Sequence, residues 1–153
     1  MTHPVLLIAL AAATAAPPVC AQFAKAEDAI RYRQAAFTVL STHFRSLNNM
    51  ASGKAPFDAK TAAADADVLA TVGALPFIAF GPGTDQGART KANPLIWQKT
   101  ADFKEDAEQS QAEIAKLVAA ARSGNLDAIK STANAVARTC KSCHDSFKDS
   151  SAE

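Results

Sequence analysis

The chain is poor in aromatic residues and has almost no net charge, and each shortage excludes a class of protein. Aromatic residues make up 7% of the 153 positions, with one Trp and one Tyr. Alanine is abundant and β-branched residues are sparse, which favours helices over strands. Sixteen Lys and Arg stand against fifteen Asp and Glu, and the basic residues form no stripe that nucleic acid would select. The composition predicts one all-α domain that does not bind nucleic acid.

Cysteine is scarce too, and one of the three cysteines lies in a segment typical of an export signal. Residues 5–13 form an apolar run that is too short to span a membrane, and small residues and prolines follow it. Val19 and Ala21 occupy the positions that a signal peptidase samples. We therefore expect a signal peptide at residues 1–21, a mature domain at residues 22–153 and, in a cell with two membranes, a periplasmic location.

A lipid anchor on Cys20 is disfavoured, because residues 17–19 read Pro-Pro-Val where a lipidated cysteine follows a Leu-x-small pattern. No membrane anchor is therefore predicted. Removal of the signal also removes Cys20 and leaves Cys140 and Cys143 in the mature chain. Beyond that one pair, no disulfide framework can form.

Four stretches of the chain repeat apolar residues every three or four positions, which predicts amphipathic helices. The first stretch carries Ile30, Phe37 and Leu47 on one face, and Asp58 is suited to cap the second. The predicted helices span residues 25–50, 58–74, 94–123 and 126–147, and a long connection without periodicity covers residues 76–93. This order predicts an antiparallel four-helix bundle.

The last predicted helix carries Cys140-Lys141-Ser142-Cys143-His144, which has the C-x-x-C-H spacing that attaches haem c. Residues three apart share a helix face, so both sulfurs can reach one edge of a porphyrin while His144 reaches the iron. Because the two cysteines continue the apolar seam of this helix, we expect the haem to lie inside the bundle, covalently attached near the C-terminus.

Two other interpretations of the cysteine pair are weighed against haem. A redox dithiol needs its C-x-x-C at a helix N-terminus after a strand, where the thiol pKa falls, whereas this pair lies near the end of the last helix. Structural zinc needs four ligands, and the fourth would have to be His43, on a different helix. Both are disfavoured, and export favours haem c because it is assembled outside the cytoplasm.

A second iron ligand would have to come from upstream, because nine residues follow His144. Met50 and His43 are the available side chains. With a rise of about 1.5 Å per residue, Phe37 lies about 9 Å along the helix axis from His43 and about 20 Å from Met50. If Phe37 faces the iron, neither can bind it, and we expect Met50 in the core and His43 partly exposed.

The chain resembles the cytochromes c′ over its whole predicted mature length. The resemblance implies one covalent high-spin haem c per subunit, with His144 as the single protein ligand. It also implies an apolar distal pocket formed by the first helix, and a homodimer packed through the first two helices. The matching residues are Gln22 to Lys25, Arg31 to Gln34, Ala74 to Phe77, Phe80 to Thr84, Trp97 and Cys140 to His144.

The resemblance further implies that Arg33 and Gln34 lie near the haem propionates and that Lys148, four residues after His144, acts on the proximal side. Arg33 also falls on the inward seam, where a buried cation needs an anion such as a propionate. The alternatives are that Arg33 snorkels to solvent and that Lys148 is simply solvated.

In the long connection, Phe77 and Phe80 are expected to pack on the haem, with a hydrophobic plug of the loop as the plain alternative. Thr90 and Lys91 could reach a propionate. The chain departs from the commoner pattern of the family at Phe37, where a Leu is usual, so the distal pocket stays apolar but loses volume.

A dry distal site without a hydrogen-bond donor stabilises O₂ poorly, whereas NO binds ferrous iron strongly without such help. We therefore predict a non-enzymatic protein that binds NO, and CO weakly, and that cycles one electron with an unidentified redox partner protein. The alternatives are a low-spin, six-coordinate electron carrier of the same superfamily, which needs a Met near Phe37, and a redox dithiol enzyme.

Overall fold

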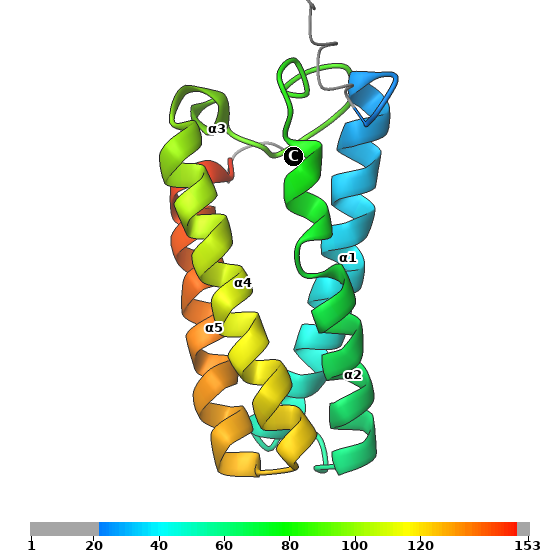
Figure 1. The fold of residues 1–153 in the computed structure, drawn as a ribbon, viewed down its shortest axis with the longest axis vertical. Helices are drawn as coiled ribbons and strands as arrows, with labels where there is room; N and C mark the ends of the chain where they lie inside the picture. The colour runs from blue at the N-terminus through cyan, green and yellow to red at the C-terminus, as the bar shows by residue number, and fades with distance from the viewer. Residues whose placement is uncertain (1–21, 150–153) are drawn as a thin grey trace, which may run out of the picture.

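A computed structural model describes residues 22–149, which form an antiparallel bundle of four main helices (Figure 1). The predicted all-α bundle is confirmed. The expected signal peptide at residues 1–21 lies outside the described residues and stays a prediction. In chain order the elements are α1 (Ala26–Ala51), α2 (Ala59–Val72), the 3-10 helix η1 (Leu75–Ala79), α3 (Leu95–Gln98), α4 (Thr100–Ser123) and α5 (Leu126–Phe147).

Local sequence determines where the helices begin and end. Asp58 caps α2 as predicted, because its side chain accepts a hydrogen bond of 2.6 Å from the Thr61 amide. Asn125 caps α5 in the same way, with 3.0 Å to the Ala128 amide. Gly124 ends α4 with a φ of +68°, which a residue without Cβ adopts readily. The chain therefore reverses within two residues, and α4 and α5 lie side by side (Figure 1).

Two predicted segments differ from the structure. The connection at residues 76–93 is helical at its start, because Pro76 lies in the first turn of η1, where its missing N–H leaves no hydrogen bond unmade. The single helix predicted for residues 94–123 is wrong: Lys99, at φ −118° and ψ 54°, leaves the helical region and separates α3 from α4.

An aliphatic core lies at the lower end of the bundle in Figure 1, where α1 ends and α5 begins. Leucine, isoleucine and valine side chains fill its centre, and alanines on α2 and α5 let the helices approach closely. The residues without measurable exposure in this core are Leu47, Ala62, Ala66, Leu69, Leu117, Ile129 and Ala133.

The stretch Ala59–Ala79 has the length and mean hydropathy, 1.5, that a membrane span would need. It consists of two elements, α2 and η1, which contact α1, and α2 also packs on α4. Ala62, Ala66 and Leu69 are buried in the aliphatic core. The apolar character of this stretch is therefore explained by packing inside the bundle.

Leu117→Ala tests the aliphatic core. The side chain is fully buried, so truncation should lower the free energy of unfolding by about 3 kcal/mol, through lost burial and the cavity left behind. Leu126→Ala is the matched control, since Leu126 is 39% exposed at the start of α5 and should cost less than about 1 kcal/mol. Urea denaturation followed by circular dichroism measures both, and equal losses would contradict this description of the core.

Candidate functional site

Six aromatic side chains gather where α4 begins and α5 ends, and we call them the aromatic cluster. Ring centroids are 5.7 Å apart for Phe37 and Phe77, 4.9 Å for Phe80 and Phe103, and 5.4 Å for Phe103 and Phe147. Most pairs meet edge to face or tilted, as the ring quadrupoles favour. The cluster draws one ring or more from α1, α3, α4, α5 and the η1 segment: Phe37, Phe77, Phe80, Trp97, Phe103 and Phe147.

Arg33 lies beside this cluster and is 2% exposed, so the alternative that it snorkels to solvent is wrong. Its guanidinium donates to Ala79 O and Thr84 Oγ1 at 3.1 Å each, and to Thr90 Oγ1 at 3.0 Å. The guanidinium carbon stands 4.4 Å from the centroid of the Phe80 ring. Arg33 therefore joins α1 to both ends of the long connection.

The charge of Arg33 has only uncharged oxygen partners among the described residues. Burial lowers the pKa of Arg33 to about 10, and the nearby Asp85 opposes that shift in part. At neutral pH the side chain remains a cation. No carboxylate within residues 22–149 forms an ion pair with it, so its surroundings can still accept an anionic group.

The other polar residues predicted for the site lie on α1, on the same connection or at the end of α5. Thr90 binds Arg33, as described, while Gln34 is exposed and donates to Arg89 O at 2.9 Å. Lys91 and Lys148 are exposed side chains whose backbones hold the connection against α5. The structure therefore brings Arg33, Thr90 and Phe80 together and leaves the two lysine side chains at the surface.

Cys140 and Cys143 are free thiols on one face of α5 and are half-buried. Cys140 packs against the aliphatic core, and Phe147, one turn after Cys143, belongs to the aromatic cluster. Burial raises the pKa of the Cys140 thiol, and burial together with the nearby Asp106 raises the pKa of Cys143 to about 11. Redox dithiols rely on a lowered pKa, so the environment disfavours the dithiol enzyme.

His144 lies one turn before the end of α5, next to the ion pair that Lys141 forms with Asp145. Partial burial and the positive charge of Lys148 lower the pKa of His144, while Asp145 acts in the opposite direction. The direction of the shift favours the neutral imidazole, which is the form that binds a metal.

The zinc alternative lacks a fourth ligand in this part of the chain. His43 lies on α1, and its Nδ1 is 2.7 Å from Oδ1 of Asp65 on α2. Across residues 22–149, no three His, Cys, Asp or Glu side chains come together as a metal site. The cysteine pair therefore has no zinc partners within the described bundle.

The residues of the site fit a covalent haem. Two thiols on one helix face match the two vinyl groups, and the aromatic cluster supplies apolar surface for the ring. Arg33 is a buried cation without a charged partner in residues 22–149, beside which a propionate would be stabilised. A four-helix bundle with C-x-x-C-H near the end of its last helix defines a c-type cytochrome of the helical-bundle class.

Comparison with known proteins identifies the family. The model of the family described as Cytochrome C' matches residues 28–148, so the chain belongs to this family. It is 47% identical to cytochrome c' of Rubrivivax gelatinosus over 84% of this chain and 99% of that protein, and 44% identical to cytochrome c' of Alcaligenes xylosoxydans xylosoxydans over 83% and 98%. The family carries covalent haem c, is not enzymatic and is typically periplasmic.

Solved structures agree with this assignment. The crystal structure of cytochrome c' from Rubrivivax gelatinosus matches with a TM-score of 0.82 over 84% of this chain and all of that chain, at 47% identity. A nitric oxide complex of a mutant cytochrome c prime from Alcaligenes xylosoxidans matches with a TM-score of 0.78 at 43% identity, over 84% of this chain and 98% of that chain.

Sequence reasoning missed three members of the site. Phe103 and Phe147 continue the apolar repeat of the third and fourth predicted helices, but helical periodicity does not tell which end of the bundle an inward residue occupies. Thr84 lies in one of the runs that match the family, and its sequence position predicts no role for it. In the structure it accepts a hydrogen bond from Arg33 and donates one to Gly81 O at 2.8 Å. The Gly-Pro-Gly-Thr run was the available signal, since such runs form turns.

Arg33→Ala should destabilise the protein, because Ala79 O, Thr84 and Thr90 would all lose a charged donor. We expect a loss of about 3 kcal/mol in the free energy of unfolding, as for other hydrogen bonds to buried charges. Arg31→Ala is the matched control: Arg31 is exposed, its ion pairs within residues 22–149 are with Glu27 and Asp28, and its loss should leave stability almost unchanged. Thermal and urea unfolding measure both, and similar effects would contradict the role of the Arg33 contacts.

Proposed function

We propose that this chain is a periplasmic, five-coordinate haem c protein that binds NO reversibly, binds CO weakly and passes single electrons through its iron. Cys140 and Cys143 hold the haem, one per subunit, and His144 is its axial ligand. The haem supplies an iron that binds a diatomic gas and changes oxidation state. The observation that carries the proposal is the C-x-x-C-H run on α5, whose two thiols are half-buried between the aliphatic core, which Cys140 contacts, and Phe147 of the aromatic cluster. The nitric oxide complexes of Alcaligenes xylosoxidans cytochrome c prime support NO as the ligand.

The protein's own residues hold the haem and exclude water. Arg33 donates hydrogen bonds from three of its five N–H groups to oxygens of the connection. Two N–H groups are left to bind a propionate. Gln34 and Thr90 lie next to Arg33 in sequence or in space and complete the polar side. Phe77 and Phe80 pack on the ring, and Lys148 adds positive charge after the axial histidine.

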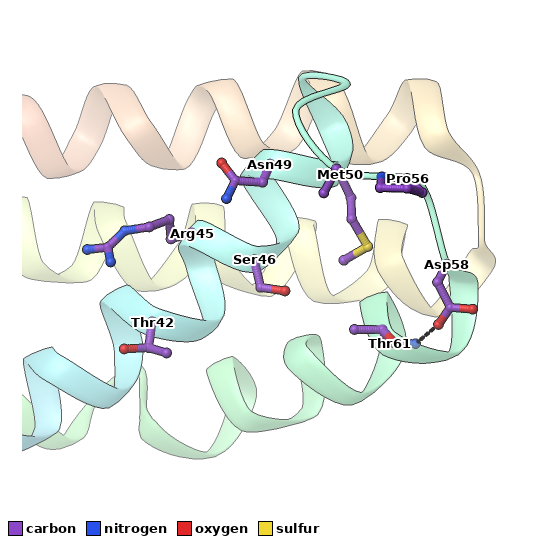
Figure 2. A pocket seen from close by; sticks show the side chains of 9 residues that line it. Thr42, Arg45, Ser46, Asn49, Met50, Pro56, Asp58 and Thr61 are labelled. Atoms are coloured by element: carbon purple, nitrogen blue, oxygen red, sulfur yellow. Dashed lines mark hydrogen bonds between the residues drawn. The ribbon is translucent and has the colours of Figure 1, made fainter.

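Five-coordination is supported by the places of the two side chains that could be a sixth ligand. Met50 is 5% exposed in the aliphatic core and borders a groove of about 450 Å³ between α1 and the start of α2 (Figure 2). That groove lies where α1 ends, whereas α5 ends at the other end of the bundle (Figure 1). His43 is bound to Asp65. The low-spin carrier is therefore the weaker alternative.

Two further parts of the proposal concern location and assembly. The typical location of the family supports the periplasm, and the predicted signal peptide at residues 1–21 would deliver the chain there. We also propose a homodimer through α1 and α2, where Val39 is 40% exposed and offers apolar surface. The redox partner protein is unidentified. We propose no nucleic-acid partner and no membrane anchor, since the one apolar stretch of sufficient length among residues 22–149, Ala59–Ala79, packs inside the bundle.

An absorption spectrum tests the central proposal. The purified wild type should show high-spin bands in both the ferric and the ferrous form, and its colour should survive extraction with acidified solvent, because the thioethers are covalent. Cys140→Ala combined with Cys143→Ala is the matched variant and should lose all unextractable haem. A low-spin ferrous spectrum at neutral pH would favour the six-coordinate carrier, and a colourless wild type would end the haem assignment.

Phe37→Ala tests the distal pocket. If the ring must move aside for a ligand, displacement in a packed site costs about 1 to 3 kcal/mol, so CO affinity should rise by about tenfold or more in the variant. Phe44 lies further along the same helix and packs against the aliphatic core. Phe44→Ala should therefore mainly lower stability. CO dissociation constants measured for both variants decide the point, and equal small effects would mean that Phe37 does not cover the iron.

A further inference from the structure

Asn93 makes four hydrogen bonds that join the start of α3 to the end of α5. Its amide N–H donates to Phe147 O at 3.0 Å and its side-chain nitrogen to Asp149 Oδ1 at 2.6 Å. Its side-chain oxygen accepts from the Leu95 amide at 2.9 Å, and its carbonyl accepts from the Ile96 amide at 3.0 Å. One side chain therefore ties two helix termini that lie more than 50 residues apart in sequence.

The backbone on either side of Asn93 continues this attachment. Ala92 and Lys148 form an isolated antiparallel bridge, and the Asp149 amide donates to Lys91 O at 2.9 Å. The Ala92 amide donates to Thr90 Oγ1 at 3.2 Å, and Thr90 accepts from the buried Arg33. Residues 90–93 thus form a continuous series of hydrogen bonds from Arg33 on α1 to the last turn of α5.

The last turn of α5 is the turn that carries His144. The Lys148 amide donates to His144 O at 3.1 Å, so Lys148 caps the hydrogen-bonded end of the helix. Helix ends fray when nothing holds their terminal groups. Because His144 lies three residues before that end, fraying would change the direction of its ring.

We propose that Asn93 is a positioning residue for the iron ligand: through Asp149 and Phe147 it holds the last turn of α5 and so keeps the His144 imidazole in a fixed orientation. The inference rests on the proposed haem function. Asn93 does not touch the imidazole and acts through the helix that bears it. Its contribution differs from that of the aromatic cluster, which shapes the apolar side of the site.

Asn93→Asp isolates the contact to Asp149. The new carboxylate keeps the oxygen that caps Leu95 but places a second negative charge against Asp149 in place of the amide donor. We expect hydrogen exchange in residues 144–149 of the holoprotein to become about tenfold faster, the effect of losing one hydrogen bond to a charged group. The iron–histidine stretching band of the ferrous protein should move to lower frequency, because a mobile helix end holds the ligand less firmly.

The double swap Asn93→Asp with Asp149→Asn exchanges amide and carboxylate and restores the hydrogen bond with reversed polarity. It should bring both the exchange rates and the iron–histidine band back to the wild-type values. Asn125→Ala is the matched control: it removes the asparagine cap at the other end of α5 and should lower stability without moving the band. If Asn93→Asp fails to fold, Asp149→Ala breaks the same contact from the C-terminal side.

The outcomes separate this inference from the proposed function. Recovery of the iron–histidine band in the double swap would support a positioning role for Asn93. An unchanged band in Asn93→Asp, or a change equal to that in Asn125→Ala, would overturn it. A wild type without covalent haem would overturn the proposed function itself, and the exchange rates would then still report whether Asn93 holds the last turn of α5.

Discussion

The buried guanidinium of Arg33 is the interaction on which the arrangement of the site depends. A cation removed from water must be surrounded by oxygens. The chain provides them from Ala79, at the end of η1, and from Thr84 and Thr90, in the connection between η1 and α3. Within that connection, hydrogen bonds join Thr84 to Gly81 O and the Ala92 amide to Thr90 Oγ1. The position of the cation on α1 therefore determines where the connection runs, and with it the Phe80 and Trp97 rings that face the guanidinium.

The two ends of the bundle are built for different purposes. At one end, aliphatic side chains from α1, α2, α4 and α5 pack to full burial and hold the helices together. At the other end, aromatic rings from α1, α3, α4, α5 and the η1 segment lie beside the buried Arg33. Because the aliphatic core stabilises the bundle, the opposite end is free to bind a cofactor, which is apolar over its ring and anionic at one edge. Cys140, packed on the aliphatic core, lies where the two regions meet.

The four main helices and the C-x-x-C-H motif were predictable because periodicity, Asp58 and Gly124 act over one or two turns of local sequence. The break at Lys99 was not, since lysine is a good helix former and nothing near it signals an end. Its neighbour Trp97 donates to Gly81 O at 2.9 Å, a contact across 16 positions that helical periodicity does not reveal. Asn93 could not be predicted for the same reason. Its partners at the start of α3 are close in sequence, but its partners at the end of α5, Phe147 and Asp149, are more than 50 residues away.

The two sides of the proposed haem site differ in their polar contacts. On the proximal side, Asn93 forms hydrogen bonds to the end of α5, whereas the distal side, on α1, is apolar at Phe37. On α1, the polar groups nearest Phe37 have backbone partners of their own: Gln34 donates to Arg89 O, Thr38 to Gln34 O, and Ser41 to Thr38 O. These three residues are exposed, and Arg33, one turn before Phe37, directs its guanidinium to Ala79 O, Thr84 and Thr90. At the position of Phe37 itself, α1 therefore presents a ring and not a donor. Bound O₂ needs a donor for its partial negative charge, whereas NO does not. Selectivity for NO would then follow from the placement of the polar side chains of α1 at the surface, where they bond to backbone oxygens. It would need no residue that recognises the gas directly.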